Sequence, residues 1–356
     1  MAEKLTEEEK ARYDRQIRVW GAEAQNRLQN AKVLVIGLSG LHAELVKNIV
    51  LAGVSVVLVD SRTVQDHDLG YNFFLEKGDV GKNVAEACIP RIQKLNDLVN
   101  VTIERKPLEE LINEKYLLQF SEVVISGGQN CGMDDACRIN EIVRNAADGI
   151  PSFWSSTGGE RGIFVVDHGE HFSFSKKAPT AAPVVTTDLT IAMSRKRKAD
   201  EDDSEDSRAI DTGEVRRIMV KVPGTSFFKV MSKRWCEIET KKMQKSPGLA
   251  TCMLMAKIAE ADMGEEQIKQ LVNSEVRKNG VDINFLGELS YISSLSRLHK
   301  YPSVAMCSSL GAYLAQEVLK GIGRTEAPNF NMTVYSGSGN SIVVYPINDE
   351  MKSPID

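Results

Sequence analysis

A glycine turn and a carboxylate downstream of it are the residues of this 356-residue chain whose types and spacing could bind a ligand. The segment from Lys32 to Asp60 is KVLVIGLSGLHAELVKNIVLAGVSVVLVD, and it contains Gly37 and Gly40. Two glycines ahead of a helix allow a tight turn in which backbone N–H groups approach an anion, and the helix N-terminus favours negative charge. Asp60, about twenty residues further on, is placed to accept hydrogen bonds from a ribose. The pattern therefore predicts a turn that could hold a nucleotide.

His42 departs from this pattern, because it stands where a third glycine is expected. A side chain there should either crowd the helix against the strand or fill space that a nucleotide would use. The sequence therefore predicts a nucleotide-binding scaffold whose binding is impaired.

The elements around the turn indicate a parallel sheet. Residues 33–36 and 54–59 are short, β-branched runs typical of buried strands, and residues 41–51 favour a helix that Ala52 and Gly53 end. Such a β-α-β unit implies parallel strands and a right-handed crossover. Further expected strands are 101–104, 123–125, 152–154, 162–167 and a hairpin over 334–345, and further expected helices are 78 or 79 to about 98, 134–147, 247–261, 265–278 and 303–319. The predicted class is α/β, a doubly wound and mostly parallel sheet.

Changes in composition along the chain indicate five segments. We expect N-terminal helices over 1–30, the sheet domain over 31–173, a charged disordered linker over 174–212, a helical insert over 213–300 and a return to the sheet over 301–356. The basic run from Arg195 to Lys198 is either a nuclear import signal or a solvated part of the linker. Small residues on one face of 303–319 suit close packing against the sheet or a partner; they are Ala305, Ser308, Ala312 and Ala315.

Net charge, hydrophobic runs and cysteine spacing argue against binding to nucleic acid, to a membrane or to a structural zinc ion. A net charge of −5 with 42% hydrophobic residues is unlike a protein that coats nucleic acid, and no apolar run approaches the length of a membrane span. The N-terminus does not resemble a signal peptide, so we expect an intracellular chain with no membrane partner. The six cysteines form no CxxC pair, which argues against a structural zinc site; they are Cys88, Cys131, Cys137, Cys236, Cys252 and Cys307.

Three arginines near the N-terminus follow a predicted helix start. Thr6 is a plausible N-cap with Glu9 in the capping-box position. Arg12, Arg15 and Arg18 recur at three-residue spacing and should share one face. On spacing alone they could be a solvated basic face, salt-bridge partners of the acidic first turn, or ligands of a partner.

Four segments in order carry a resemblance to a known family. RYDRQIRVWG, VLVIGLSGLHAELVKNIVLAGV, DVGKNVAEA and the late AQEVLKG resemble the adenylation domain of the ubiquitin-like-protein activating enzymes, over roughly residues 10–165 and 300–345. The resemblance implies a Rossmann-like adenylation domain. It also implies that two such domains pair, one of them active and the other degenerate.

Compared with active members, this chain lacks the residues that the resemblance assigns to ATP and magnesium. Tyr71 matches the arginine of the family's phosphate-gripping loop, Val84 matches a lysine, and Gln129 matches the magnesium-handling aspartate. A phosphate clamp needs cations and a magnesium site needs carboxylates, and none of the three supplies a charge. With His42, the resemblance implies the degenerate half, with ATP and Mg²⁺ bound by the partner subunit and no cofactor or metal bound here.

The resemblance also implies roles for an arginine and for the cysteines. The family's Tyr-Asp-Arg-Gln arginine reaches the phosphates of ATP in the partner, and the match is Arg15, whereas Arg18 should pair locally or support the interface. Cys236 and Cys252 lack the family's Pro-x-Cys-Thr context and should be structural, so the catalytic cysteine belongs to the partner.

Length is similar to the short degenerate subunits of the branch that activates SUMO, which implies a catalytic subunit as partner, indirect contact with SUMO, and a nuclear and cytoplasmic location. A degenerate subunit for NEDD8, a self-sufficient homodimer of the sulfur-carrier type and a nicotinamide-dependent oxidoreductase stay open as alternatives.

Overall fold

A computed structural model describes the sheet domain almost completely. The described residues are 5–128, 130–147, 149–170, 172–177, 217–221, 224–227, 230, 254, 257–258, 263, 265–279, 301–329, 331–337 and 341–345. Gln129, Cys236, Cys252, the basic run 195–198 and most of the predicted helix 247–261 lie outside the described residues.

Eight strands form one sheet in the order β10-β9-β6-β5-β4-β1-β2-β3. Their bounds are β1 (Lys32–Ile36), β2 (Ser55–Val59), β3 (Val101–Ile103), β4 (Glu122–Ser126), β5 (Ser152–Gly158), β6 (Arg161–Asp167), β9 (Met332–Ser336) and β10 (Ser341–Tyr345). The strands from β3 to β5 pair in parallel, and β5-β6-β9-β10 pair antiparallel. A separate ribbon joins β7 (Ser173–Lys177) to β8 (Arg217–Lys221). The predicted α/β class with a mostly parallel, doubly wound sheet is confirmed.

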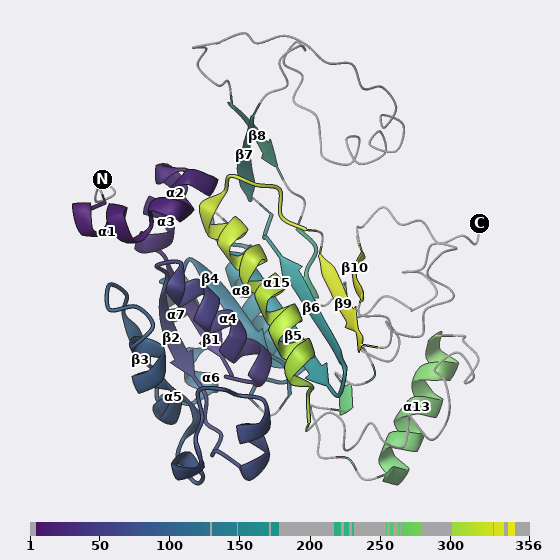
Figure 1. The fold of residues 1–356 in the computed structure, drawn as a ribbon. Coiled ribbons are helices and arrows are strands. Elements are labelled where there is room, and N and C mark those ends of the chain that lie inside the picture. The colour runs from purple at the N-terminus through teal and green to yellow at the C-terminus, as the bar shows by residue number, and fades with distance from the viewer. Residues whose placement is uncertain are drawn as a thin grey trace, which may run out of the picture.

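Helices cover both faces of the sheet (Figure 1). The α-helices are α1 (Glu7–Arg12), α2 (Asp14–Trp20), α3 (Ala22–Asn30), α4 (Gly40–Leu51), α5 (Val84–Gln93), α6 (Leu108–Leu111), α7 (Glu114–Leu117), α8 (Met133–Arg144), α13 (Glu265–Asn279) and α15 (Val304–Gly323), and the 3-10 turns are η1 (Asp66–Gly70) and η2 (Lys77–Asp79). Among these, α4, α5 and α15 pack on one face, and α6, α7 and α8 pack on the other. None of the described helices is long and apolar enough to cross a bilayer.

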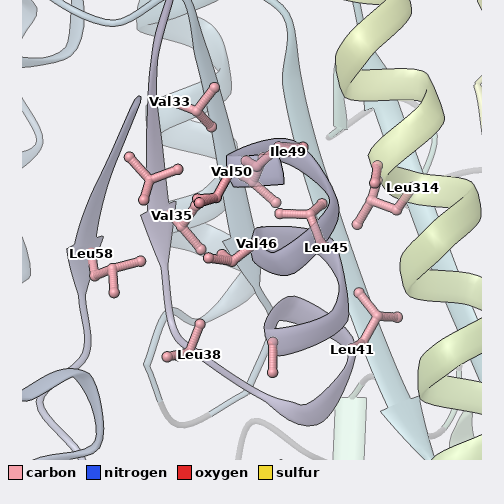
Figure 2. Packing of buried hydrophobic residues seen from close by; sticks show 14 of the residues in the cluster. Val33, Val35, Leu38, Leu41, Leu45, Val46, Ile49, Val50, Leu58 and Leu314 are labelled. Atoms are coloured by element: carbon pink, nitrogen blue, oxygen red, sulfur yellow. The ribbon is translucent and has the colours of Figure 1, made fainter. Parts of the chain in front are cut away.

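The alternation of β1 divides the core into two layers. Val33 and Val35 contact α4 on one face, whereas Leu34 and Ile36 contribute to the cluster on the other face. Figure 2 shows α4 lying between β1 and α15, with Leu314 of α15 directed at α4. Each of these side chains is almost fully buried, and each such burial is worth roughly 1.5–3 kcal/mol. The glycine turn between β1 and α4 is therefore fixed by a packed core on both sides.

The contact between α15 and α4 depends on Gly311. A Cβ atom at this position would lie 2.6 Å from the Leu41 carbonyl oxygen and 2.8 Å from Glu44 Cβ. The predicted small-residue face is packed in part: Ala315 is buried in the core, Ser308 and Ala312 are half-buried, and Ala305 is exposed. Large apolar residues, Gly311 and Ala315 together form the packed face of α15.

Several predicted boundaries differ from the structure. The helix expected from 78 or 79 begins at Val84, because Gly81 has a φ of +86° and the Asn83 side chain caps the helix by accepting from Glu86 N at 3.0 Å. It ends at residue 93 instead of about 98. The strand expected over 152–154 runs to residue 158, since β6 pairs with its whole length. The linker expected from 174 begins with strand residues, which β8 pairs.

Candidate functional site

The glycine turn lies where the order of the parallel strands reverses. From β1 the sheet continues to β2 and β3 on one side and to β4 and β5 on the other, and ligands of such sheets bind at the carboxyl ends of the strands at this reversal. Gly37 has a φ of +82°, which glycine adopts without strain, and its N–H donates to the Val59 carbonyl at 2.7 Å. Ser39 caps α4. The structure thus places the predicted glycine turn at the edge of the sheet where ligands of this fold bind.

The anion that this turn holds is a side chain of the same protein. Leu38 N–H donates to Asp60 Oδ2 at 2.7 Å, and the Asp60 carboxylate is fully buried. Arg62 binds the same carboxylate, with Nη2 at 2.9 Å from Oδ2 and Nε at 3.2 Å from Oδ1. Asp60 was predicted to accept from a ribose; in this structure its acceptor positions face Leu38 and Arg62.

Arg62 is held by two carboxylates. Its Nη1 lies 3.8 Å from Asp68 Oδ1, and its side chain is 22% exposed. Burial opposes the charge, but the carboxylates of Asp60 and Asp68 more than compensate and raise the pKa of the Arg62 guanidinium. Arg62 is therefore a fixed cation beside the glycine turn.

Tyr71 occupies the place where the resemblance expects a phosphate-gripping arginine. Its ring packs on Gly40 so closely that a Cβ there would lie 2.8 Å from Tyr71 Cδ2. Its hydroxyl donates to Asp68 Oδ1. Burial, together with this hydrogen bond, raises the pKa of the Tyr71 phenol. The side chain is neutral and covers the turn instead of offering a cation to a phosphate.

Asn130 and Ser126 lie against the glycine turn from the end of β4 and the loop after it. A Cβ at Gly37 would lie 2.7 Å from Ser126 Cβ. With its amide oriented to satisfy both neighbours, Asn130 donates to Asp60 Oδ1 at 2.9 Å and accepts from Arg62 Nε at 2.9 Å. The residue before it, Gln129, was predicted to replace a magnesium ligand and lies outside the described residues.

His42 joins α4 to β5. It is fully buried, with Nδ1 2.8 Å from Ser39 Oγ and Nε2 3.3 Å from Ser155 Oγ. Burial, with a smaller contribution from the positive charge of Arg62, lowers the pKa of His42 to about 3. The ring is neutral near neutral pH and supplies no cation to a phosphate.

Val84 is buried at the first turn of α5. Its N–H donates to the Arg62 carbonyl at 3.0 Å, so the position that the family resemblance assigns to a lysine is part of the apolar core. Of the predicted site residues, Gly37, Gly40, His42, Asp60 and Tyr71 gather at the turn. Together with Val84, they offer no free cation there.

Arg15 lies apart from the turn, exposed on α2. Within the part of the chain that the structure describes, it makes no hydrogen bond or ion pair. Arg18 pairs with Asp14 at 2.9 Å, whereas Arg12 belongs to α1 and binds Asp97, so the three arginines do not act as one face.

Buried contacts fix the helix that carries Arg15. The Tyr13 ring is buried, and its hydroxyl accepts from Asn96 Nδ2 at 2.8 Å. Trp20 Nε1 donates to Gln25 Oε1 at 3.0 Å, and Gln25 Nε2 donates to the Ala52 carbonyl at 2.9 Å. One end of α2 is thereby held by the loop after α5 and the other by the end of α4, which leaves the outer face of α2 exposed to solvent.

Sequence reasoning missed Arg62, Asp68 and Asn130. The spacing of Asp60 and Arg62 could have indicated their ion pair, because an acid and a base two residues apart can bind each other. Asn130 comes from another strand end, and no local pattern connects it to Asp60. Among the described residues, no three His, Cys, Asp or Glu side chains are grouped to hold a metal ion.

A cavity of about 490 Å³ lies at the opposite, amino edge of the sheet. Ser121 and Pro151, which precede β4 and β5, line it together with Gly321 and Arg324 at the end of α15. It is separate from the glycine turn.

Comparison with known proteins settles the family. The model of the ThiF family matches residues 13–352. The chain belongs to the ThiF family. This ThiF-family chain is 29% identical to SUMO-activating enzyme subunit 1 of Bos taurus and 28% identical to that of Homo sapiens, in each case over 95% of both chains. It is also 28% identical to the DNA damage tolerance protein RHC31 of Saccharomyces cerevisiae, over 94% of this chain and 96% of that protein.

Solved structures agree on the fold of this ThiF-family chain. The crystal structure of SeMet PaaA has a TM-score of 0.54 and 12% identity, covering 98% of this chain and 77% of that one. The structure of E. coli MccB with succinimide has a TM-score of 0.52 and 15% identity, covering 97% and 73%. The predicted resemblance to the ubiquitin-like-protein activating enzymes is confirmed by the sequence relatives.

Proposed function

We propose that this chain is the non-catalytic subunit of a heterodimeric SUMO-activating enzyme. Its relatives named as subunit 1 of that enzyme match over 95% of both chains, which fits the length argument and disfavours a longer NEDD8-type subunit. The glycine turn carries no free cation and is covered by Tyr71, which supports a degenerate role. ATP and Mg²⁺ would be bound by the partner subunit, which would also supply the cysteine that accepts SUMO as a thioester.

Arg15 carries this proposal. Adenylation of a carboxylate by ATP develops charge on the reacting phosphate while pyrophosphate leaves, and a fixed guanidinium stabilises that charge. Arg15 projects from a helix that is tied down at both ends, so little ordering is needed when a partner's phosphates approach. In this proposal Arg15 acts in trans, and the rest of the chain positions it.

The test is Arg15→Ala in the purified heterodimer, measured by ATP–pyrophosphate exchange. We expect the exchange rate to fall by about 100-fold, the size seen when one charge-stabilising donor is removed, while the dimer stays intact in gel filtration. Arg18→Ala is the matched control, because Arg18 lies on the same helix and pairs with Asp14. Unchanged exchange in Arg15→Ala, or an equal loss in the control, would remove this role.

A self-sufficient homodimer stays an alternative, and exchange activity of the chain alone would favour it over the proposal. A nuclear location with a cytoplasmic fraction also stays a prediction. Imaging the tagged chain tests it, and a purely cytoplasmic signal would contradict it.

A further inference from the structure

We propose that nucleotide is kept out of this glycine turn by the chain's own side chains, Asp60, Arg62 and Tyr71, which occupy the turn as an internal ligand. The inference concerns this chain alone, so it does not depend on the identity of the partner or of the modifier.

The first step is that the anion position is filled. A glycine turn before a helix binds anions through backbone N–H groups. Here Leu38 N–H already donates to the Asp60 carboxylate at 2.7 Å, and this carboxylate is fully buried. A phosphate or a ribose would have to displace this buried carboxylate from Leu38 N–H while Arg62 still binds it.

The second step is that Arg62 and Asn130 lock the carboxylate. Arg62 contacts Asp60 through Nη2, Nε and its own backbone N–H, which lies 2.9 Å from Oδ1. Asn130 bridges the two charged groups at 2.9 Å from each. Arg62 Nη2 also donates to the Leu38 carbonyl at 3.3 Å, so the guanidinium spans the turn itself. Breaking a buried, hydrogen-bonded ion pair of this kind is costly, because it leaves an uncompensated charge.

The third step is that Tyr71 covers the helix N-terminus. Its ring lies against Gly40, the glycine whose missing side chain would let a ligand approach. Asp68 accepts from its hydroxyl and also lies 3.8 Å from Arg62, so the cover and the ion pair belong to one network. The space that glycine leaves open is thus taken by tyrosine.

Two causes of lost nucleotide binding can be told apart. If the missing cation is the cause, restoring a lysine at the matching position, Val84→Lys, should bring binding back. If occupied space is the cause, removing Arg62 and Tyr71 should bring binding back, because the Asp60 carboxylate is then free to face a ribose, whereas Val84→Lys should not. The two variants therefore give opposite results.

The experiment is a fluorescence titration of the isolated, full-length chain with a fluorescent ADP analogue in the presence of Mg²⁺, with unlabelled ADP as competitor. We expect no saturable binding by the unmodified chain or by Val84→Lys, whose folding is checked by thermal unfolding because Val84 is buried in the core. We expect Arg62→Ala/Tyr71→Ala to bind saturably, at least about tenfold more tightly than the weakest affinity that the titration could detect for the other two. Arg62→Met/Tyr71→Ala serves if the first variant does not fold, as judged by thermal unfolding, because Met keeps the length of the apolar stem.

Three results would overturn the inference. One is saturable binding by the unmodified chain, because the turn would then be open. Another is a gain in Val84→Lys without a gain in a folded double variant, because charge would then be the cause. The third is no gain in either folded double variant, because Arg62 and Tyr71 would then not be what holds Asp60 in place and excludes nucleotide.

Discussion

The polar groups inside the closed turn are paired with residues of the same chain. Two carboxylates, Asp60 and Asp68, face one guanidinium, Arg62, and a neutral phenol donates to the second carboxylate. His42 contributes no charge, because burial keeps its imidazole neutral. The network thus satisfies its polar groups without a ligand, as a buried polar cluster must if it is to be stable.

His42 should make the folded state sensitive to acid. Its pKa of about 3 in the folded state lies below the value of about 6.5 in the unfolded chain, so between these values the unfolded chain binds the extra proton. Stability contributed by His42 is therefore lost as the pH falls from 6.5, by about 2 kcal/mol at pH 5. We expect His42→Gln to lose about that much less than the unmodified chain between pH 7 and pH 5.

Urea unfolding at the two pH values measures this difference. The buried groups His168 and Glu122 also titrate with shifted pKa values, the first lowered and the second raised by burial, but both are present in each protein and cancel in the comparison. An equal loss of unfolding free energy in the two proteins would show that His42 does not control the acid response.

At the scale of elements, the approach of α15 to α4 sets the geometry under the glycine turn. Gly311→Ala should lower the free energy of unfolding by about 1–2 kcal/mol, because its Cβ would lie 2.6 Å from the Leu41 carbonyl oxygen and the helices would have to separate. The gain in helix propensity, up to about 1 kcal/mol, offsets only part of this cost.

Gly323→Ala is the matched control in the same helix. A Cβ there meets Ala24 Cβ at 3.6 Å, an ordinary contact, so this change should be neutral or stabilising in urea unfolding. If both variants are equally stable, the close approach at Gly311 does not constrain the two helices.

The elements show what a single sequence can predict about this fold. The strands β1, β2, β4 and β6 and the helix α4 follow from apolar runs and from capping residues, which are local signals. The start of α5 was missed because both Asp79 and Asn83 are residues that can cap a helix. Gly81, which lies between them and has a positive φ, excludes the earlier start, and a positive φ cannot be read from the sequence. The packed face of α15 was predicted only in part: Ala315 is buried as expected, but the glycine that lets α4 approach, Gly311, was not among the predicted small residues.

The candidate site was less predictable than the fold. Gly37, Gly40 and Asp60 are recognisable from spacing, and the structure brings them together. What fills the site is set by long-range contacts: Asn130 follows β4, and Ser155 lies on β5. Sequence periodicity carries no information about such pairs, so it could indicate impaired binding but not the side chains that close the turn.

At the scale of the whole molecule, the glycine turn and the exposed face of α2 have different roles. The turn is closed by its own residues, whereas α2 is tied to the end of α4 and displays Arg15, Arg18 and Val19. A subunit that acts through a partner needs such a rigid outer face. The proposed function therefore places the partner against α2.

Val19 tests that placement, because it is a large apolar side chain 73% exposed on the same helix as Arg15. Val19→Asp should weaken association with the adenylating partner by about tenfold or more, since a buried carboxylate at an interface is costly without a counter-charge. The thermal unfolding of the isolated chain should not change, because Val19 makes little contact within it. Calorimetric titration with the partner measures the affinity.

Val80→Asp is the control for that titration. Val80 is 40% exposed and follows η2, away from α2, so an added charge there changes the surface without touching the proposed interface. A loss of affinity in Val19→Asp alone would place the partner on α2. Arg15, on the same helix, would then lie close enough to contact the phosphates of ATP bound in the partner. Equal affinity of both variants would place the partner elsewhere, and Arg15 would then have no phosphate within reach.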